Sequence, residues 1–209
     1  MIKRRDPYHH GDLRRALVNA ATELARSHGP DDVILREVAR RVGVSASAAY
    51  RHFADRDALL AAVASRARAA MAEAMIDAVA RRPPIGDPRS DAVARFRVIG
   101  RAYIAFALEE PGLFRTAFGA WPALTEPGDL SPSTMLIAAL DNLVATGAMS
   151  SSRRVGAEGA AWAAVHGISI LLADGALGQV DSRGRDAVVD RTLDLVVSGL
   201  VRHRFIGTG

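Results

Sequence analysis

Small, hydroxyl-bearing and cationic side chains gather between Ser45 and Arg56, and together they could bind a nucleic acid. The segment begins with Ser45, Ala46, Ser47 and Ala48, whose small side chains would let the backbone approach a DNA groove closely. Serine hydroxyls can hydrogen-bond phosphates or base edges, and an alanine methyl can contact the methyl group of thymine. Because none of the four is large, we expect part of any sequence specificity to come from DNA shape.

The following residues offer groups suited to the phosphate backbone. We predict that Tyr50, His52 and Arg56 contact phosphates, and we include Arg51 in the same set. The alternative for each polar residue is packing within the domain, and packing is the role predicted for Phe53.

Two short helices must position these side chains. Residues 35–42 carry apolar side chains at helical spacing, and the pattern breaks at Gly43. Ser45 is then the candidate N-cap of a second helix over 46–53. Two short helices joined by a tight turn with glycine at the bend form a helix-turn-helix, whose second helix can lie in a DNA major groove.

Composition narrows the class of protein further. The chain has 209 residues, of which 49% are apolar and 5% aromatic, and it has no cysteine. The absence of cysteine excludes disulfides, thiolate nucleophiles and cysteine zinc sites. The apolar runs are shorter than the roughly 18 residues of a membrane span, and no signal peptide opens the chain, so we expect a cytoplasmic protein without a membrane partner. The net charge is +4, and residues 1–60 hold 11 Lys and Arg against 8 Asp and Glu.

Apolar periodicity and helix-stop residues predict an all-α chain of about nine helices. We expect an N-terminal three-helix helix-turn-helix domain over residues 1–57 and a C-terminal helical bundle over 58–209. Asp55 and Asp87 are predicted helix caps, and residues 3–5 form a basic arm that could reach DNA. Apart from the two helices of the motif, the expected helices cover residues 12–27, 58–81, 88–110, 113–118, 132–145, 154–176 and 185–204.

The first 60 residues resemble the DNA-binding domain of the tetracycline-repressor (TetR) family. The resemblance rests on residues 35–39 (LREVA), 43–45 (GVS), 50–53 (YRHF) and 55–60 (DRDALL). Residues 8–14 (YHHGDLR) resemble one subgroup, whose C-terminal domain carries a Trp-x-x-x-His-Gly element that appears here from Trp162 to Gly167.

The resemblance implies an all-helical homodimer that binds a short pseudopalindromic operator in double-stranded DNA. It also implies a small-molecule effector that binds in the C-terminal bundle and weakens DNA binding, with no cofactor, metal or catalytic residue. The family places the side chain at Arg36 near base edges, where arginine can bridge guanine O6 and N7.

Three positions depart from the family pattern. Ile34 stands where Thr or Ser is usual, so this side chain can neither cap the next helix nor bond a phosphate, although Asp31 or Asp32 could cap instead. Ser47 replaces the usual glycine. Arg56 replaces the usual lysine, which keeps the charge and adds a planar fork suited to phosphate.

Aromatic residues of the C-terminal half are candidates for an effector pocket, although plain core packing is the alternative for each. Trp162 and His166 lie at i and i+4 and share one helix face, so a ligand could stack on the indole and bond the imidazole, or a neighbouring group could satisfy the histidine. The candidate lining residues besides this pair are Tyr103, Phe106, Phe114, Phe118, Trp121 and Met135.

The last two expected helices, over residues 154–176 and 185–204, are our choice for the dimer interface. Six small residues keep one side of the first thin, which would permit close contact between helices: Gly156, Gly159, Ala160, Ala161, Ala163 and Ala164. The second carries an apolar face that could serve the interface or fold inward: Leu193, Val196, Val197, Leu200 and Val201.

Repression is the leading interpretation, and three other functions are its alternatives. A transcriptional activator could share the same fold. An enzyme would have to use His166 with Asp174 or Glu158 for acid–base chemistry, and the sequence has no nucleophile elbow, phosphate loop or metal-ligand spacing beside them. A helical adaptor that binds proteins would leave Arg36 and the other basic residues of the motif without a role.

Overall fold

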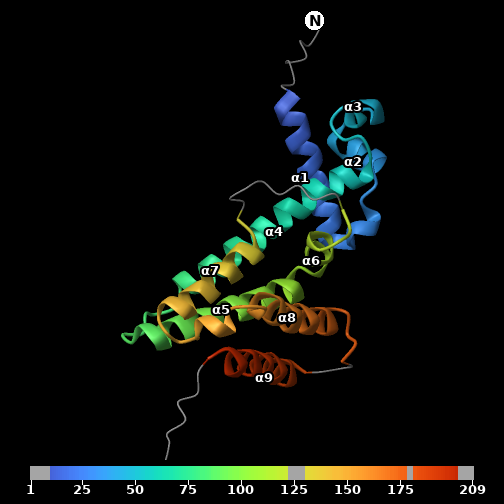
Figure 1. Ribbon diagram of the computed structural model, residues 1–209. Helices are drawn as coiled ribbons and strands as arrows, with labels where there is room; N and C mark the ends of the chain where they lie inside the picture. Colours follow the sequence, from blue (N-terminus) through green and yellow to red (C-terminus); the bar gives the residue numbers. More distant parts are fainter. Residues whose placement is uncertain (1–9, 122–129, 178–180, 202–209) are drawn as a thin grey trace, which may run out of the picture. The chain divides into compact units, whose positions relative to one another are not determined.

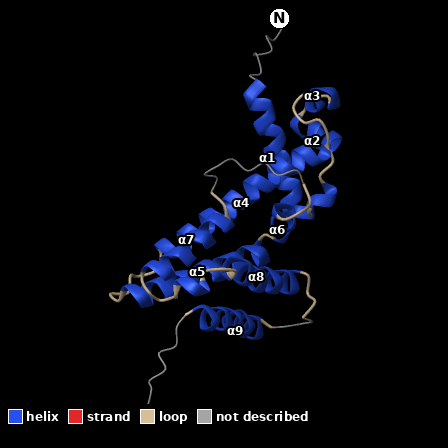
Figure 2. Ribbon diagram, in the orientation of Figure 1, coloured by secondary structure: helices blue, strands red, loops and turns tan. Residues whose placement is uncertain are grey.

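The computed structural model describes residues 10–121, 130–177 and 181–201, and these residues form helices without any strand, which confirms the all-α prediction (Figures 1 and 2). The basic arm at residues 3–5, with Tyr8 and His9 of the subgroup resemblance, lies outside the described residues. The nine α-helices and two short 3-10 helices of the described chain are α1 (His10–His28), η1 (Pro30–Asp32), α2 (Leu35–Val42), α3 (Ala46–Tyr50), α4 (Arg56–Ala80), α5 (Pro88–Glu109), α6 (Pro111–Ala117), α7 (Pro132–Ala145), η2 (Ser151–Arg153), α8 (Ala157–Ala173) and α9 (Ser182–Leu200).

The chain divides into two compact units. Unit 1 comprises residues 1–67 and 110–127, and unit 2 comprises residues 68–109 and 128–209. Unit 1 therefore includes α6 as well as the helix-turn-helix, and α4 contributes to both units. The boundary between residues 57 and 58, chosen from the sequence, stays a prediction.

Unit 1 forms around the apolar faces of α1, α2 and the start of α4. Leu17, Val38 and Leu59 are completely buried there. Helix α6 packs against α1 at Gly112, where a Cβ atom would lie 2.1 Å from the carbonyl oxygen of Ala25. No other residue type fits this approach without a shift of one helix backbone.

Unit 2 is built around α5, which contacts α7, α8 and α9. One buried cluster includes Phe96, Leu140 and Leu143, and a second includes Ile104 and Leu193. No helix in the described part of the chain is both long enough and apolar enough to cross a membrane.

Side-chain caps set several helix starts. Asp55 accepts from the Ala58 N–H at 2.7 Å, and Asp87 accepts from the Ser90 N–H at 2.8 Å, so both predicted caps are confirmed. Asp181 accepts from the Gly184 N–H at 2.8 Å, which starts α9 at Ser182, three residues before the predicted position. The helix predicted over 154–176 is shorter, because Gly156 has a left-handed φ of 76° and separates α8 from η2.

Candidate nucleic-acid interface and ligand sites

The turn between α2 and α3 follows directly from the glycine and serine in its sequence. Gly43 adopts a left-handed conformation with φ 76° and ψ 29°, and the N–H of Val44 donates to the carbonyl of Ala39 at 3.0 Å. The Ser45 hydroxyl then accepts a hydrogen bond from the Ala48 N–H at 3.2 Å. The predicted N-cap is therefore confirmed, and α3 begins at Ala46.

Helix α3 divides its side chains sharply between the inside of unit 1 and the solvent. Ser45, Ser47 and Tyr50 are exposed, with 46% of the Tyr50 surface accessible, and Ala46 is half-buried. Ala48 is buried beside Ala49, with 8% of its surface exposed. The burial of its methyl group disfavours the predicted contact between Ala48 and DNA, which stays a prediction.

The helix predicted to continue to residue 53 ends at Tyr50. His52 and Phe53 both donate their N–H groups to the carbonyl of Ala49, at 2.9 and 3.1 Å, in a tight turn. Phe53 is buried as predicted, and the guanidinium carbon of Arg14 lies 4.9 Å from the centre of its ring. The buried ring of Phe53 therefore takes the chain into the core three residues after the end of α3, while His52 remains half-buried.

Helix α2 begins without any side-chain cap. Ile34 occupies the N-cap position with 54% of its surface exposed and makes no capping hydrogen bond, as its side chain predicts. Asp31 and Asp32 lie in η1, so the suggestion that one of them caps α2 is wrong.

Arg36, in the first turn of α2, is exposed and makes no hydrogen bond or ion pair with the described residues. Arg51 is also exposed and has no such partner in the described chain. The guanidinium groups of both residues are therefore available to phosphates or bases.

Two other arginines of α2 are held by one carboxylate. Arg40 donates two hydrogen bonds to Glu37, both at 2.8 Å, and Arg41 donates one at 3.0 Å. The hydrogen bonds from Arg40, and then the one from Arg41, lower the pKa of Glu37 to about 2. Glu37, Arg40 and Arg41 together carry a net charge of +1. The positive charge that α2 presents is therefore smaller than its number of arginines indicates.

Arg56 makes two hydrogen bonds to backbone carbonyls inside unit 1. Its Nε donates to the carbonyl of Val33 at 2.9 Å and its Nη2 donates to the carbonyl of Pro30 at 2.6 Å. Its guanidinium carbon lies 5.8 Å from the centre of the Trp121 ring. The side chain therefore fixes the segment that leads into α2, and its predicted phosphate contact stays a prediction.

The candidate aromatic residues are divided between the two units. In unit 1, Phe114 and Phe118 meet edge to face with ring centres 5.2 Å apart, and Trp121 Nε1 donates to the carbonyl of Thr116 at 2.7 Å. Phe106, in unit 2, is buried, with 8% of its surface exposed. The contacts of these residues agree with the alternative of core packing.

In unit 2, Trp162, Tyr103 and His166 form a hydrogen-bonded chain. Trp162 Nε1 donates to the Tyr103 hydroxyl oxygen at 3.3 Å, and this hydroxyl lies 2.7 Å from His166 Nδ1. The hydroxyl oxygen has two acceptor lone pairs and one donor hydrogen, so the bond to Nδ1 forms with either tautomer of a neutral histidine. Burial raises the pKa of Tyr103 and lowers the pKa of His166, which keeps both groups uncharged near neutral pH.

This chain of contacts agrees with the alternative in which a neighbouring group satisfies His166. Trp162 and His166 meet edge to face, with ring centres 6.0 Å apart. Glu158 and Asp174 are each eight residues from His166, about 12 Å along a helix axis. Neither carboxylate can pair with the imidazole from there, so the geometry does not support acid–base catalysis by these residues.

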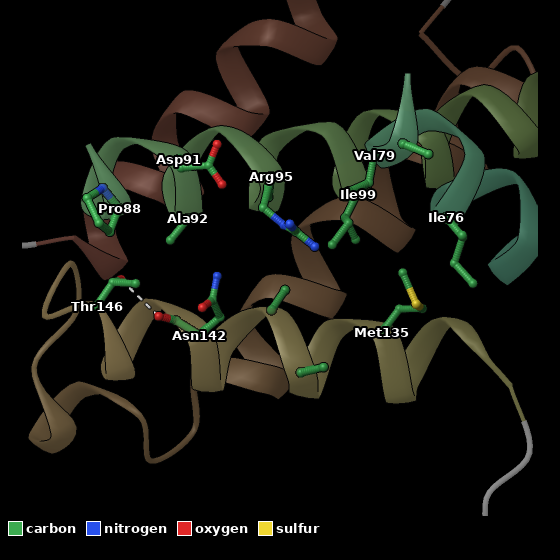
Figure 3. Close-up of a pocket in the computed structure, with 13 residues that line it drawn as sticks. Ile76, Val79, Pro88, Asp91, Ala92, Arg95, Ile99, Met135, Asn142 and Thr146 are labelled. Atoms are coloured by element: carbon green, nitrogen blue, oxygen red, sulfur yellow. Dashed lines mark hydrogen bonds between the residues drawn. The ribbon is translucent and has the colours of Figure 1, made fainter. Parts of the chain in front are cut away.

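A cavity of about 760 Å³ lies within unit 2, and the sequence had pointed only to Met135 among its walls (Figure 3). Its volume is typical of small-molecule sites. We call it the α5–α7 cavity, and its lining comprises Ile76, Val79 and Ala80 from α4, Pro88, Asp91, Ala92, Arg95 and Ile99 from α5, Met135, Ala138, Ala139 and Asn142 from α7, and Thr146.

The apolar face of α9 chosen for the dimer interface points into unit 2. Leu193 and Leu200 have 1% and 8% of their surfaces exposed, and Val196 and Val197 pack against the core. Leu193 and Leu200 therefore fold inward, as the alternative predicted, and the interface role of the partly buried Val196, Val197 and Val201 stays a prediction. Leu195, on the opposite side of α9, is 67% exposed.

Helix α8 exposes a face of small and apolar side chains. A Cβ atom placed on Gly159 or Gly167 would meet no neighbouring group within 4 Å, and Ile170 and Leu171 are about 40% exposed. Ala163 is exposed on the same helix, whereas Ala161 is buried. The small residues predicted to favour close contact are therefore partly on the surface and partly in the core.

The fold and the helix-turn-helix define a DNA-binding regulator with a C-terminal helical domain. Residues 17–63 match the model of bacterial regulatory proteins of the tetR family, and residues 96–196 match the tetracyclin repressor-like C-terminal domain. The chain belongs to the TetR family. No curated protein matches it.

Solved structures share this fold along nearly the whole chain. A protein of unknown function from Rhodococcus sp. RHA1 is 30% identical, with 95% of this chain and all of that chain covered and a TM-score of 0.73. A TetR variant from Acinetobacter baumannii AYE in complex with minocycline is 23% identical over 88% of this chain and 93% of its own, with a TM-score of 0.62. RolR in complex with resorcinol is 17% identical over 93% and 97% of the two chains, with a TM-score of 0.58.

Proposed function

We propose that this protein is a transcriptional repressor that binds a pseudopalindromic operator as a homodimer and releases it when a small molecule binds. The observation that carries the proposal is the exposed surface of the helix-turn-helix. Ser45, Ser47 and Tyr50 project from the start and end of α3, and Arg36 stands free on α2. A short helix with this surface suits a major groove.

Within this surface the residues have different roles. Arg36 is the proposed base-reading residue, because an unpaired guanidinium can bridge guanine O6 and N7. Tyr50, Arg51 and His52 are the proposed phosphate contacts, and their contacts would fix the position of α3 on the duplex. An activator of the same fold would need the same DNA contacts. A reporter assay therefore has to decide between repression and activation.

A homodimer would present two reading surfaces related by two-fold symmetry, which matches two operator half-sites. Exposed apolar and small residues on α8 and α9 support an interface there, with Ile170, Leu171 and Leu195 as the apolar contacts and Gly159 as a point of close approach. A ligand that favours one spacing of the two surfaces would shift the population away from the DNA-bound state.

The proposed effector binds in unit 2. The structures of the Acinetobacter TetR variant in complex with minocycline and of RolR in complex with resorcinol support a small-molecule effector for this chain. The α5–α7 cavity has a suitable volume, whereas Phe114, Phe118 and Trp121 belong to unit 1. We therefore propose the cavity, and not the aromatic set predicted from the sequence, as the effector site.

The test begins with selection of bound sites from random duplex DNA, followed by gel shifts with the selected sequence. Arg36→Ala should lower operator affinity about 5- to 150-fold, the range expected for loss of one base-specific contact of about 1–3 kcal/mol. Tyr50→Phe should lower affinity by a smaller factor, and affinity should fall steeply as salt rises.

Arg183→Ala is the matched control, because Arg183 is exposed in the first turn of α9 and makes no hydrogen bond or ion pair with the described residues. It removes the same charge from unit 2 and should leave operator affinity unchanged. Equal affinities for the Arg36 and Arg183 variants would refute the assigned contact, and failure of the wild-type protein to select any duplex at low salt would refute the proposed function.

A further inference from the structure

The α5–α7 cavity has one unpaired charge, and that charge is positive. Arg95 is the only cation among the 13 lining residues, and Asp91 is the only anion. Arg95 makes no hydrogen bond or ion pair with the described residues. Figure 3 shows its side chain reaching from α5 into the space between α5 and α7.

The carboxylate of Asp91 is already occupied. Arg82 donates a hydrogen bond to Asp91 Oδ1, and the N–H of Ile85 donates to the same oxygen at 2.9 Å. The side chains of Arg82 and Asp91 are only 14% and 21% exposed. These hydrogen bonds, with that from Arg82 largest, lower the pKa of Asp91, and the positive charges of Arg82 and Arg95 add to the effect. Arg82, Asp91 and Arg95 together therefore carry a net charge of +1, and the guanidinium of Arg95 is the one without a hydrogen-bond partner among the described residues.

A second polar group faces the same space from the opposite helix. The side chain of Asn142 points from α7 toward α5 (Figure 3) and makes no hydrogen bond with any described residue. The Thr146 hydroxyl, by contrast, donates to the backbone carbonyl of Asn142 at 2.9 Å. Arg95 and Asn142 therefore offer the unused hydrogen-bond donors of the cavity, one charged and one neutral.

The rest of the cavity wall is mainly apolar. Ile99 lies one helical turn beyond Arg95 on α5, and Met135 lies two turns from Asn142 on α7, about 10 Å along the axis. Ile76 and Val79 of α4 line the same end (Figure 3). The cavity is therefore polar and cationic toward Asn142 and apolar toward Met135.

We infer that the α5–α7 cavity binds a small apolar carboxylic acid, with its carboxylate on Arg95 and Asn142 and its apolar body along Ile99 and Met135. A carboxylate supplies two acceptor oxygens, which match the planar fork of a guanidinium. The exposure of Arg95 gives the anion a route from solvent. The inference deepens the proposed function, on which it rests, by naming the chemical class of the effector.

Calorimetric titration of the full chain without DNA tests the inference. The probes are octanoate and 4-phenylbutyrate, each paired with its primary amide, which has nearly the same shape but no charge. The wild-type protein should bind at least one acid, and should bind the corresponding amide at least about tenfold more weakly, because a hydrogen bond to a charged group contributes about 1.5–3 kcal/mol.

Arg95→Gln should weaken binding of the acid at least about tenfold and leave binding of the amide unchanged. Arg183→Gln removes the same charge outside the cavity and should bind both probes as the wild type does. Equal affinity for acid and amide, binding of the acid by Arg95→Gln at the wild-type level, or no binding of either acid would overturn the inference.

Gel shifts of the same proteins with the selected duplex, with and without the acids, distinguish failure of this inference from failure of the proposed function. If an acid binds but does not release the duplex, the carboxylate site in the cavity is supported and the proposed release of DNA by this ligand is refuted. If the protein binds the duplex but neither acid, the proposed DNA-binding function is supported and the carboxylate assignment is refuted.

Discussion

Substitution of Arg56 by lysine separates two roles that the sequence and the structure suggest for this position. A phosphate contact needs only a positive charge, which lysine keeps. The observed contacts need a planar fork, because Nε reaches the carbonyl of Val33 while Nη2 reaches that of Pro30. A lysine has a single nitrogen, which cannot occupy the positions of both Nε and Nη2. We therefore expect Arg56→Lys to destabilise unit 1.

The magnitude follows from the two lost hydrogen bonds. A hydrogen bond to a charged group contributes about 1.5–3 kcal/mol when buried, but 36% of the Arg56 side chain is exposed and water would replace part of each bond. About 1 kcal/mol per bond is then reasonable, or about 2 kcal/mol in total. For a chain of this length such a loss lowers Tm by roughly 4–8 °C.

The assay is urea unfolding at one fixed protein concentration, followed by tryptophan fluorescence. The chain has two tryptophans, so a shared Trp162→Phe background leaves Trp121, whose ring centre lies 5.8 Å from the guanidinium carbon of Arg56, as the reporter for unit 1. Arg36→Lys is the control, since Arg36 has no partner in the described chain and its replacement should change stability by less than about 0.5 kcal/mol. Equal midpoints for the Arg56→Lys and wild-type proteins would refute the structural role and return Arg56 to the phosphate contacts.

Two further predictions concern the packing of unit 1 and the pH response of unit 2. Gly112→Ala should destabilise the protein by about 1–3 kcal/mol in urea unfolding, because the new methyl group would lie 2.1 Å from the carbonyl oxygen of Ala25. Gly86→Ala is the control, because its methyl group would meet no atom within 4 Å. Equal losses of stability for the two variants would contradict the close approach of α6 to α1. Burial lowers the pKa of His166 below its ordinary 6.5, so the unfolded chain binds the proton more readily, and this contribution to stability is complete above pH 6.5 and is lost as the pH falls through the folded-state pKa. Tm should therefore fall more for the wild type than for His166→Asn between about pH 7.5 and 5.5, and parallel decreases would show that the histidine does not control this loss.

Local signals in the sequence predicted the helix-turn-helix well. The left-handed turn at Gly43 and the cap at Ser45 depend on a few neighbouring residues, so they can be read from residue types alone. The inward orientation of Ala48 could not be read in this way, since a five-residue helix is too short to show a periodic pattern. The end of α3 at Tyr50, three residues before the buried Phe53, was not predicted either.

The α5–α7 cavity could not be predicted from the sequence, because aromatic residues mark apolar surface without showing whether a cavity adjoins it. Phe106 is packed in the core, and Tyr103 is bonded to Trp162 and His166. Small residues from different helices, such as Ala92 of α5 and Ala138 of α7, line the α5–α7 cavity. A cavity is space left unfilled between several helices, so no single segment of the sequence reveals it.

The α9 stripe shows the same limit for interfaces. Leu193, Val196, Val197 and Leu200 follow the i, i+3, i+4, i+7 spacing of one apolar face; in the structure Leu193 and Leu200 are buried, and Val196 and Val197 are partly buried against the core. The spacing cannot say whether the covering surface belongs to the same chain or to a partner, and here it is the core of unit 2. An interface on α9 is therefore better sought among the residues that interrupt the stripe. Leu195 is such a residue, so its exposure is better evidence for a partner than the periodic face itself.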